Sequence, residues 1–419
     1  MSKSDFGLFG LGVMGKSLSR NLAQKGFKIS LFNRHVPDVE VDVAKHFKEA
    51  HPELETAEAF DDIEAFVASL ASPKKIMLMV NAGKTIDIVI ASLLPFLSEN
   101  DIIIDGGNSN YKKTKERFTY LQTKGIEFIG TGVSGGEEGA LKGPSIMPSG
   151  SKEAYNNVAN YLETIAAKDK NNLPCCTYVG PEGSGQFIKM VHNGIEYVEM
   201  QLLAEVATIL KHKGKHPEEI ANILDSFKST DDSYLLEITS NIFRKKEGDS
   251  WLVEKILDKA GNKGTGNWAT IASAELGVPN TLIASALFAR YISFYKDERV
   301  QLYNQFTKKS VSRLNVDDKD LLNAYQFART INHYQGFKLI HEASEKLNWN
   351  LNLSEIARIW TNGCIIRSSL MEDLVAVFKE TNYVLTSATI ANNIIGCKPA
   401  IKRVVSDCVL SDVPTPALS

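Results

Sequence analysis

The chain has 419 residues, which is enough for two or three domains with a large buried core. Its 43% hydrophobic and 23% charged residues are typical of a soluble globular protein. A formal net charge of -3 gives no basic field, so we expect no nucleic-acid partner. The five cysteines form no ligand-like CxxC pair, which indicates reduced thiols and no metal site.

No targeting or membrane-spanning segment is evident. Met1 to Asp5 lead straight into an apolar strand without the layout of a signal peptide. No later stretch is apolar for long enough to cross a bilayer. The sequence therefore predicts a cytoplasmic protein with no membrane partner.

A glycine-rich turn follows the first predicted strand, residues 6–9, and precedes a helical pattern. It matches G-x-G-x-x-G, in which the first glycine makes the tight turn, the second admits a pyrophosphate and the third lets helix and strand pack closely. The start of the helix then faces the pyrophosphate charge. We predict that a dinucleotide is bound by Gly10, Leu11, Gly12, Val13, Met14 and Gly15.

The second predicted strand, residues 28–32, ends in Asn33, Arg34 and His35. An acidic residue at this point would hold the ribose hydroxyls of NAD, and none is present. An arginine can instead pair with a 2′-phosphate and stack on the adenine, so the sequence favours NADP as the cofactor. The alternative is a solvated arginine in a loop.

Further short apolar runs predict buried strands at residues 76–80, 101–105, 127–130 and 176–180. Loops 106–109 and 133–136 then lie at carboxyl ends of strands, where doubly wound sheets bind ligands. We therefore predict an α/β domain with a doubly wound, Rossmann-type parallel sheet over residues 1–180.

Long amphipathic patterns take over from residue 184, and they predict an all-helical domain over residues 181–419. The predicted helices are 187–210, 217–228, 231–245, 268–276, 281–295, 317–347 and 353–375. The loop 261–266 contains three glycines, Lys263 and Thr265, which suits an anionic ligand. A simple flexible turn is the alternative.

Four polar residues interrupt the most apolar of these helices. Lys189, His192, Asn193 and Glu196 are spaced i, i+3, i+4 and i+7, so they share one helix face. A base, an acid and two hydrogen-bonding groups among apolar neighbours suggest that this face lines a cavity. The alternative is an internally paired lysine and glutamate on a half-exposed helix.

Together these motifs resemble the 6-phosphogluconate dehydrogenase family over nearly the whole chain. The motifs that carry the resemblance are residues 10–15, 33–34, 101–109, 132–140, 189–197, 263–266 and 363–368. The family oxidatively decarboxylates 6-phosphogluconate to ribulose 5-phosphate and CO₂ and transfers the hydride to NADP. The resemblance also implies a homodimer that assembles through the helical half.

The resemblance implies a role for each matching residue. Lys189 would be the general base for the 3-hydroxyl, and Glu196 would donate a proton to the enediol carbon. Burial would favour both roles, because it lowers the pKa of a lysine and raises that of a glutamate. The implied substrate contacts are Asn108, Ser134, Gly135, Gly136, Lys189, His192, Asn193, Glu196, Tyr197, Lys263, Thr265 and Arg290. The implied further cofactor contacts are Val80, Asn81, Ala82 and Asn108.

Three positions depart from the family pattern. Asn81 replaces a usual lysine, His35 replaces a usual threonine, and the chain stops at Ser419, where the family continues into a tail with two phosphate ligands. The sequence is then expected either to be truncated or to lack those ligands.

Two other functions are considered from the sequence. One is a β-hydroxyacid dehydrogenase of the 3-hydroxyisobutyrate type, against which the cations Lys263 and Arg290 argue. The other is an idle cofactor-binding protein, against which the intact pair Lys189 and Glu196 argues.

Overall fold

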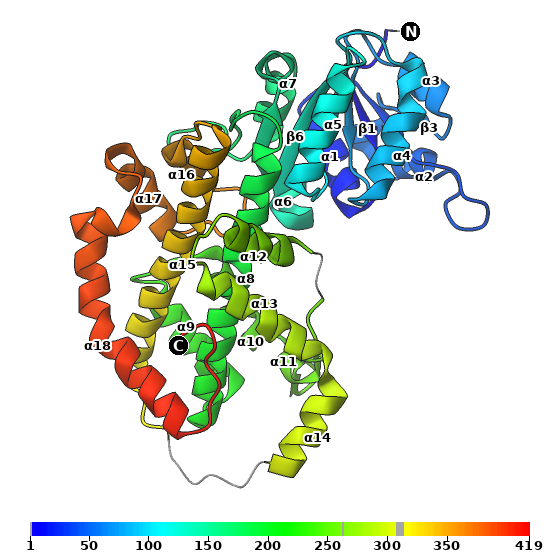
Figure 1. Ribbon diagram of the computed structural model, residues 1–419. Helices are drawn as coiled ribbons and strands as arrows, with labels where there is room; N and C mark the ends of the chain where they lie inside the picture. Colours follow the sequence, from blue (N-terminus) through cyan, green and yellow to red (C-terminus); the bar gives the residue numbers. More distant parts are fainter. Residues whose placement is uncertain (1, 262–263, 307–313) are drawn as a thin grey trace. The chain divides into compact units, whose positions relative to one another are not determined.

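The computed structural model describes residues 2–261, 264–306 and 314–419 (Figure 1). The chain forms two compact units, Met1–Met190 with Leu347–Ile365, and Val191–Lys346 with Ile366–Ser419. Helix α8, Ser184–His212, is continuous from the first unit into the second. The predicted domain limits, 1–180 and 181–419, mark where the sequence changes from α/β to helical patterns. They describe another property than the two compact units, and they stay a prediction.

A seven-stranded sheet forms the centre of the first unit, with the order β3-β2-β1-β4-β5-β6-β7. The strands are β1 (Phe6–Phe9), β2 (Ile29–Phe32), β3 (Glu58–Phe60), β4 (Lys75–Leu78), β5 (Ile102–Asp105), β6 (Glu127–Ser134) and β7 (Ser145–Gly150). Neighbouring strands are parallel except β6 and β7, which are antiparallel. The doubly wound sheet is therefore confirmed. The strand order reverses at β1 and β4, where such sheets bind ligands.

Helices cover both faces of this sheet (Figure 1). They are α1 (Val13–Gln24), α2 (Val43–Glu49), α3 (Ile63–Ala68), α4 (Lys84–Leu93), α5 (Tyr111–Gln122), α6 (Gly136–Lys142) and α7 (Lys152–Ile165). Successive strand residues point to opposite faces, so the unit has two cores. Leu8 and Leu31 pack with α1 and α7, whereas Phe9 and Phe32 stack at 4.2 Å on the side of α3 and α4.

Three strand predictions differ from the structure. Residues 176–180 are not a strand and make only isolated bridges to β7, because Pro148 has no N–H with which to continue a ladder. Strand β7 was not predicted, since a proline argues against a strand. Strand β3 was missed because it has three half-buried residues.

The second unit is almost entirely helical, as predicted. Its helices beyond α8 are α9 (Pro217–Phe227), α10 (Tyr234–Arg244), α11 (Leu252–Lys255), α12 (Thr265–Glu275), α13 (Thr281–Phe294), α14 (Lys296–Phe306), α15 (Asp318–Leu347), α17 (Ser369–Glu380) and α18 (Ala388–Leu410). A short hairpin joins β8 (Lys246–Glu247) and β9 (Ser250–Trp251).

The predicted helix 353–375 is wrong, because two helices occupy this range. The first, α16 (Leu353–Ile359), belongs to the first unit, and the second is α17. Gly363 between them has a φ of +68°, which a helix cannot accommodate. The Ser368 side chain then caps α17 by accepting the Met371 N–H. The polar α14 and the proline-containing α18 were not predicted.

Candidate active site

The glycine turn between β1 and α1 has the geometry that a bound dinucleotide needs. Gly10 has a φ of +102°, and a Cβ there would lie 2.7 Å from the Met79 carbonyl oxygen. A Cβ on Gly15 would lie 2.0 Å from the Gly10 carbonyl oxygen, so helix and strand approach as closely as predicted. Gly12 is exposed, and a Cβ there would meet nothing within 4 Å. The turn thus leaves open the position at which a pyrophosphate would approach.

The end of β2 carries an acid that the sequence analysis missed. Asn33 accepts a hydrogen bond from the Leu11 N–H at 3.2 Å and donates one to Glu40 at 2.9 Å. Arg34 pairs with the same carboxylate at 2.9 Å, and its side chain is 71% exposed. The hydrogen bond from Arg34 lowers the pKa of Glu40. Glu40 was not predicted because it is seven residues from Asn33 in the sequence, and a turn at residues 36–40 brings it back to Asn33 and Arg34. His35 is exposed.

The loop after β4 lies beside the glycine turn. A Cβ on Gly10 would lie 2.8 Å from a methyl carbon of Val80. Asn81 and Ala82 are exposed at the carboxyl end of the strand. Gly83 then begins α4 with a φ of +93°. Val80, Asn81 and Ala82 therefore adjoin the other predicted cofactor residues.

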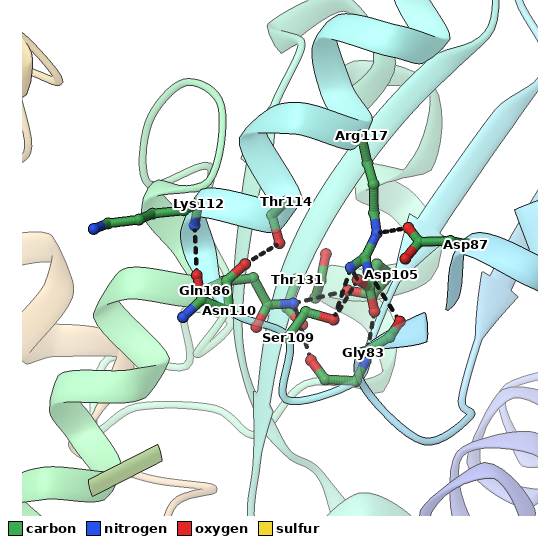
Figure 2. A network of polar contacts seen from close by, with 11 residues as sticks. Gly83, Asp87, Asp105, Ser109, Asn110, Lys112, Thr114, Arg117, Thr131 and Gln186 are labelled. Atoms are coloured by element: carbon green, nitrogen blue, oxygen red, sulfur yellow. Dashed lines mark hydrogen bonds and ion pairs between the residues drawn. The ribbon is translucent and has the colours of Figure 1, made fainter. Parts of the chain in front are cut away.

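The loop after β5, which contains Asn108, is held by hydrogen bonds to Asp105. Figure 2 shows Asp105 and Ser109 in this polar network. Asp105 is fully buried and accepts hydrogen bonds from the Gly107 N–H at 3.1 Å and the Ser109 hydroxyl at 2.6 Å. Burial raises the pKa of Asp105. Asn108, between these two anchored residues, is exposed. The fold therefore holds the backbone of this loop while its asparagine side chain faces solvent.

The end of β6 carries the second predicted substrate loop. Strand β6 extends to Ser134, so Ser134 is a buried strand residue and not the loop residue that was predicted. Gly135 and Gly136 have φ values of +118° and +61°. A Cβ on Gly136 would meet nothing within 4 Å, which leaves the backbone open to a ligand.

Helix α8 carries the polar stripe. Lys189 is 6% exposed, and a Cβ on Gly132 of β6 would lie 2.5 Å from the Lys189 Cβ. His192 is fully buried, and its Nδ1 lies 3.3 Å from the Asn193 Oδ1 and 4.0 Å from the Glu196 Oε2. The Glu196 side chain is 17% exposed. The stripe is therefore largely buried, and the helix is not the half-exposed one of the alternative interpretation.

Three residues predicted to bind the substrate phosphate come together in the second unit. The Arg290 guanidinium lies 4.3 Å from the centre of the Tyr197 ring and donates a hydrogen bond to the Gly261 carbonyl. Thr265 is the first residue of α12, and a Cβ on the next residue, Gly266, would lie 2.9 Å from the Tyr197 ring. Lys263 lies outside the described residues. Arg290 and the start of α12, which carries Thr265, thus both lie against the Tyr197 ring.

In the part of the chain that the structure describes, the His, Cys, Asp and Glu side chains form no group of three or more that could hold a metal ion. All five cysteines are buried and free, and burial raises the pKa of Cys176 above that of an ordinary thiol. Buried thiols with raised pKa values are unreactive.

Two residues that the sequence analysis did not identify bond to neighbours of the predicted site residues. Arg117 of α5 is 5% exposed and bonds both to the Asn108 loop and to Gly83. Gln186 of α8 is 1% exposed and donates to three backbone carbonyl groups. The one sequence feature that could have indicated Arg117 and Gln186 is a charged or amide residue on the apolar face of a predicted helix.

Two family profiles together cover nearly the whole chain. The profile of the NAD binding domain of 6-phosphogluconate dehydrogenase matches residues 5–180. The profile of the 6-phosphogluconate dehydrogenase C-terminal domain matches residues 185–419.

Individual proteins give the same result. The Staphylococcus aureus (strain N315) protein named 6-phosphogluconate dehydrogenase, decarboxylating is 44% identical over 99% of this chain and 89% of its own length. The NADP(+)-dependent, decarboxylating enzyme of Bacillus subtilis (strain 168) is 43% identical over 100% of this chain and 90% of its own. The structure of Plasmodium falciparum 6-phosphogluconate dehydrogenase, studied with NADP+ and 6-phosphogluconate, is 36% identical with a TM-score of 0.92. It covers 99% of this chain and 90% of its own.

Proposed function

Because the chain belongs to the 6-phosphogluconate dehydrogenase family, we propose that it oxidatively decarboxylates 6-phosphogluconate to ribulose 5-phosphate and CO₂ with reduction of NADP. The observation that carries this proposal is the position of Lys189. This lysine is buried on the polar face of α8 and packs against Gly132 of β6. A buried lysine in a polar stripe is the general base that oxidation of a hydroxyl group needs.

The cofactor residues act by binding and orientation. When bound, NADP accepts the hydride from C3 of the substrate. The residues from Gly10 to Gly15 would hold its pyrophosphate at the start of α1. Arg34 would bind the 2′-phosphate, for which it must exchange its present partner Glu40. Val80, Asn81, Ala82 and Asn108 would line the path towards the nicotinamide.

The catalytic residues act by moving protons. Lys189 would take the proton of the 3-hydroxyl as the hydride leaves C3. The resulting ammonium group would donate a hydrogen bond to the 3-keto oxygen, so that the electron pair of the breaking C–C bond is stabilised as CO₂ departs. Glu196 would then donate a proton to the enediol carbon. His192 and Asn193 would orient the substrate on the same helix face.

Charge and hydrogen bonding would select the substrate. Asn108, Ser134, Gly135 and Gly136 would bind its carboxylate and hydroxyl groups. The phosphate would be bound by Tyr197, Lys263, Thr265 and Arg290, because a phosphate with nearly two negative charges needs several charge-assisted partners. A 3-hydroxyisobutyrate-type substrate has no phosphate for these residues, and the family membership argues against that alternative.

We also propose that the protein is a cytoplasmic homodimer. Among the helices of the described ranges, none has the length and apolar character to cross a bilayer. The consecutive helices α13 and α14 expose large apolar side chains, which at this density favour a protein interface. They are Phe288, Ile292, Phe294, Tyr295, Val300, Leu302, Tyr303 and Phe306. The measured mass in solution would test this, with a change of Ile292 and Tyr303 to glutamate expected to give monomers.

A direct absorbance assay for reduced nicotinamide tests the function. We expect formation of reduced nicotinamide with 6-phosphogluconate and NADP, slower turnover with NAD, and none with 3-hydroxyisobutyrate. Equal turnover with gluconate would contradict the assigned phosphate site. No turnover, together with normal NADP binding, would instead support the idle cofactor-binding protein.

A further inference from the structure

The residues proposed to act on the substrate in the first unit come from separate elements. Lys189 lies on α8, Asn108 follows β5, and Ser134 ends β6. Proton transfer needs these groups in a fixed arrangement, and a displacement of about 1 Å can cost a hundredfold in rate. Some structure must therefore join the loop of Asn108 to the helix of Lys189.

Gln186 makes this connection. Its side-chain amide nitrogen lies 3.1 Å from the Asp105 carbonyl oxygen, 2.9 Å from that of Gly107 and 3.2 Å from that of Thr131 (Figure 2). It lies one helical turn before Lys189 on α8. One buried amide thus contacts the end of β5, the Asn108 loop and β6.

The packing around Gln186 leaves little freedom. A Cβ on Gly185 would lie 2.2 Å from the Met147 carbonyl oxygen, so the first turn of α8 lies directly against β7. A Cβ on Gly130 would lie 3.5 Å from the Gln186 Cγ. Because Gly132 approaches the Lys189 stem in the same way, α8 is in contact with the sheet at both residues.

Arg117 holds the same loop from the opposite side. It donates to the Ser109 hydroxyl at 3.4 Å and lies 3.5 Å from the Asp105 carboxylate. It also donates to the Gly83 carbonyl at 3.0 Å and to Asp87 at 2.7 Å. These bonds join the Asn108 loop to the end of the loop Val80–Gly83 that is proposed to bind the cofactor.

We propose that Gln186 and Arg117 are positioning residues that fix the Asn108 loop relative to Lys189 and to the cofactor loop. Neither needs to touch the substrate, since each acts through backbone and side-chain groups of residues that flank the site. This inference rests on the proposed function, because Lys189 and Asn108 are the groups whose placement it explains.

The test replaces each residue by methionine, which has no hydrogen-bond donor. Methionine keeps the side-chain length of Gln186 and is shorter than the side chain of Arg117. For Gln186→Met we expect kcat to fall by about 10- to 100-fold while the Kd for NADP stays within roughly threefold. For Arg117→Met we expect a similar loss of kcat together with weaker NADP binding, since it also holds the cofactor loop.

Gln201→Met is the control on the same helix, because Gln201 donates to Glu205 within α8 and to none of the loops of the proposed site among the described residues. It should leave kcat unchanged. Thermal unfolding of each variant would be recorded, and hydrogen exchange of the amides of residues 106–109 would report the order of the loop without any need for turnover.

The outcomes separate this proposal from the proposed function. An active unmutated protein with an equally active Gln186→Met variant would overturn the positioning role and leave the function intact. An inactive unmutated protein would overturn the function, and faster exchange of residues 106–109 in Gln186→Met would still support the part of the proposal in which Gln186 fixes this loop. Unchanged exchange in both methionine variants would overturn it in either case.

Discussion

Each compact unit encloses an arginine between two acidic side chains, and the comparison shows how one kind of contact serves two purposes. Arg117 in the first unit is bound to Asp87 and Asp105. Arg329 in the second is bound to Glu199 and Asp231. Both arginines are at least 95% buried, with side chains 5% and 1% exposed.

The partners of the two arginines differ. Arg117 bonds to Gly83 in the loop after β4 and to Ser109 in the loop after β5, and those loops carry residues proposed to bind cofactor and substrate. Arg329, on α15, bonds to Glu199 of α8, which the Tyr325 hydroxyl also contacts at 3.3 Å. We therefore interpret Arg117 as a residue that positions the proposed site, and Arg329 as a residue that joins α15 to α8 and to the turn before α10, where Asp231 lies. Burial and pairing alone therefore do not identify function.

The largest expected effect concerns Lys189, the proposed general base in the same unit as Arg117. Lys189→Met should lower kcat by about 10²–10⁴ because it removes the general base, while NADP binding stays nearly unchanged. Lys74→Met is the matched control, since Lys74 is also buried and pairs with Asp101 at 2.8 Å. It should reduce stability and keep turnover. Turnover of Lys189→Met within a fewfold of normal would remove Lys189 from the mechanism.

The second effect tests the scaffold role of Arg329. Arg329→Met leaves Glu199 and Asp231 buried without their cation, so the free energy of unfolding should fall by roughly 3–5 kcal/mol. Urea unfolding would measure this loss. The pair of the exposed Arg403 and the half-buried Asp320 gives the control, because Arg403→Met should cost less than about 1 kcal/mol. A similar loss of unfolding free energy in both variants would contradict the scaffold role of Arg329.

The third effect concerns Glu205, a buried acid on α8 whose partners given below are amide groups and not an arginine. Glu205 accepts the N–H groups of Ala417 and Leu418 at 2.9 and 3.0 Å, and burial raises its pKa to about 7 from 4.5. An acid with a raised folded-state pKa costs stability as pH rises, because the unfolded chain ionises first. Relative to Glu205→Gln, the normal protein should therefore lose up to about 3 kcal/mol between pH 4.5 and 7.

Chemical unfolding at a series of pH values would measure this difference. Glu342→Gln is the control, since its partner Lys338 lowers the pKa of Glu342, which is then ionised in both states above pH 5. Its effect should stay flat from pH 5 to 8. A flat curve for Glu205→Gln as well would show that Glu205 ionises normally.

The smallest effect concerns an exposed arginine. Arg34→Ala should reduce the preference for NADP over NAD by about tenfold to a hundredfold, since a charge-assisted bond contributes roughly 1.5–3 kcal/mol. Glu40→Gln should strengthen NADP binding a few-fold, because it removes the present partner of Arg34. Coenzyme titrations of both variants would measure these changes. An unchanged preference in Arg34→Ala would assign 2′-phosphate recognition to other residues.

Much of the fold and part of the site follow from local sequence patterns. The turn at Gly10–Gly15 and the helix that carries Lys189 were predicted because turn chemistry and helical spacing are properties of neighbouring residues. The strand at residues 145–150 was not predicted because it contains a proline. Residues 353–375 were predicted as one helix because a single glycine did not indicate the break at Gly363.

The residues that hold the site were not predictable in this way. Arg117 bonds to Gly83 34 positions away, and Gln186 bonds to Thr131 55 positions away and to Asp105 81 positions away. No periodicity or motif within one segment encodes such partners. Glu40 is closer in sequence, yet only the turn at residues 36–40 brings its carboxylate to Arg34.

The sequence by itself determined the α/β and helical halves, the family and the identity of the groups on the face of α8. These depend on residue type and spacing along one helix, strand or turn. Only the tertiary structure decided which buried charges position the site and which join the scaffold. The physical reason is that the effect of a buried donor or charge depends on the groups around it, and the fold brings those groups together from distant parts of the chain.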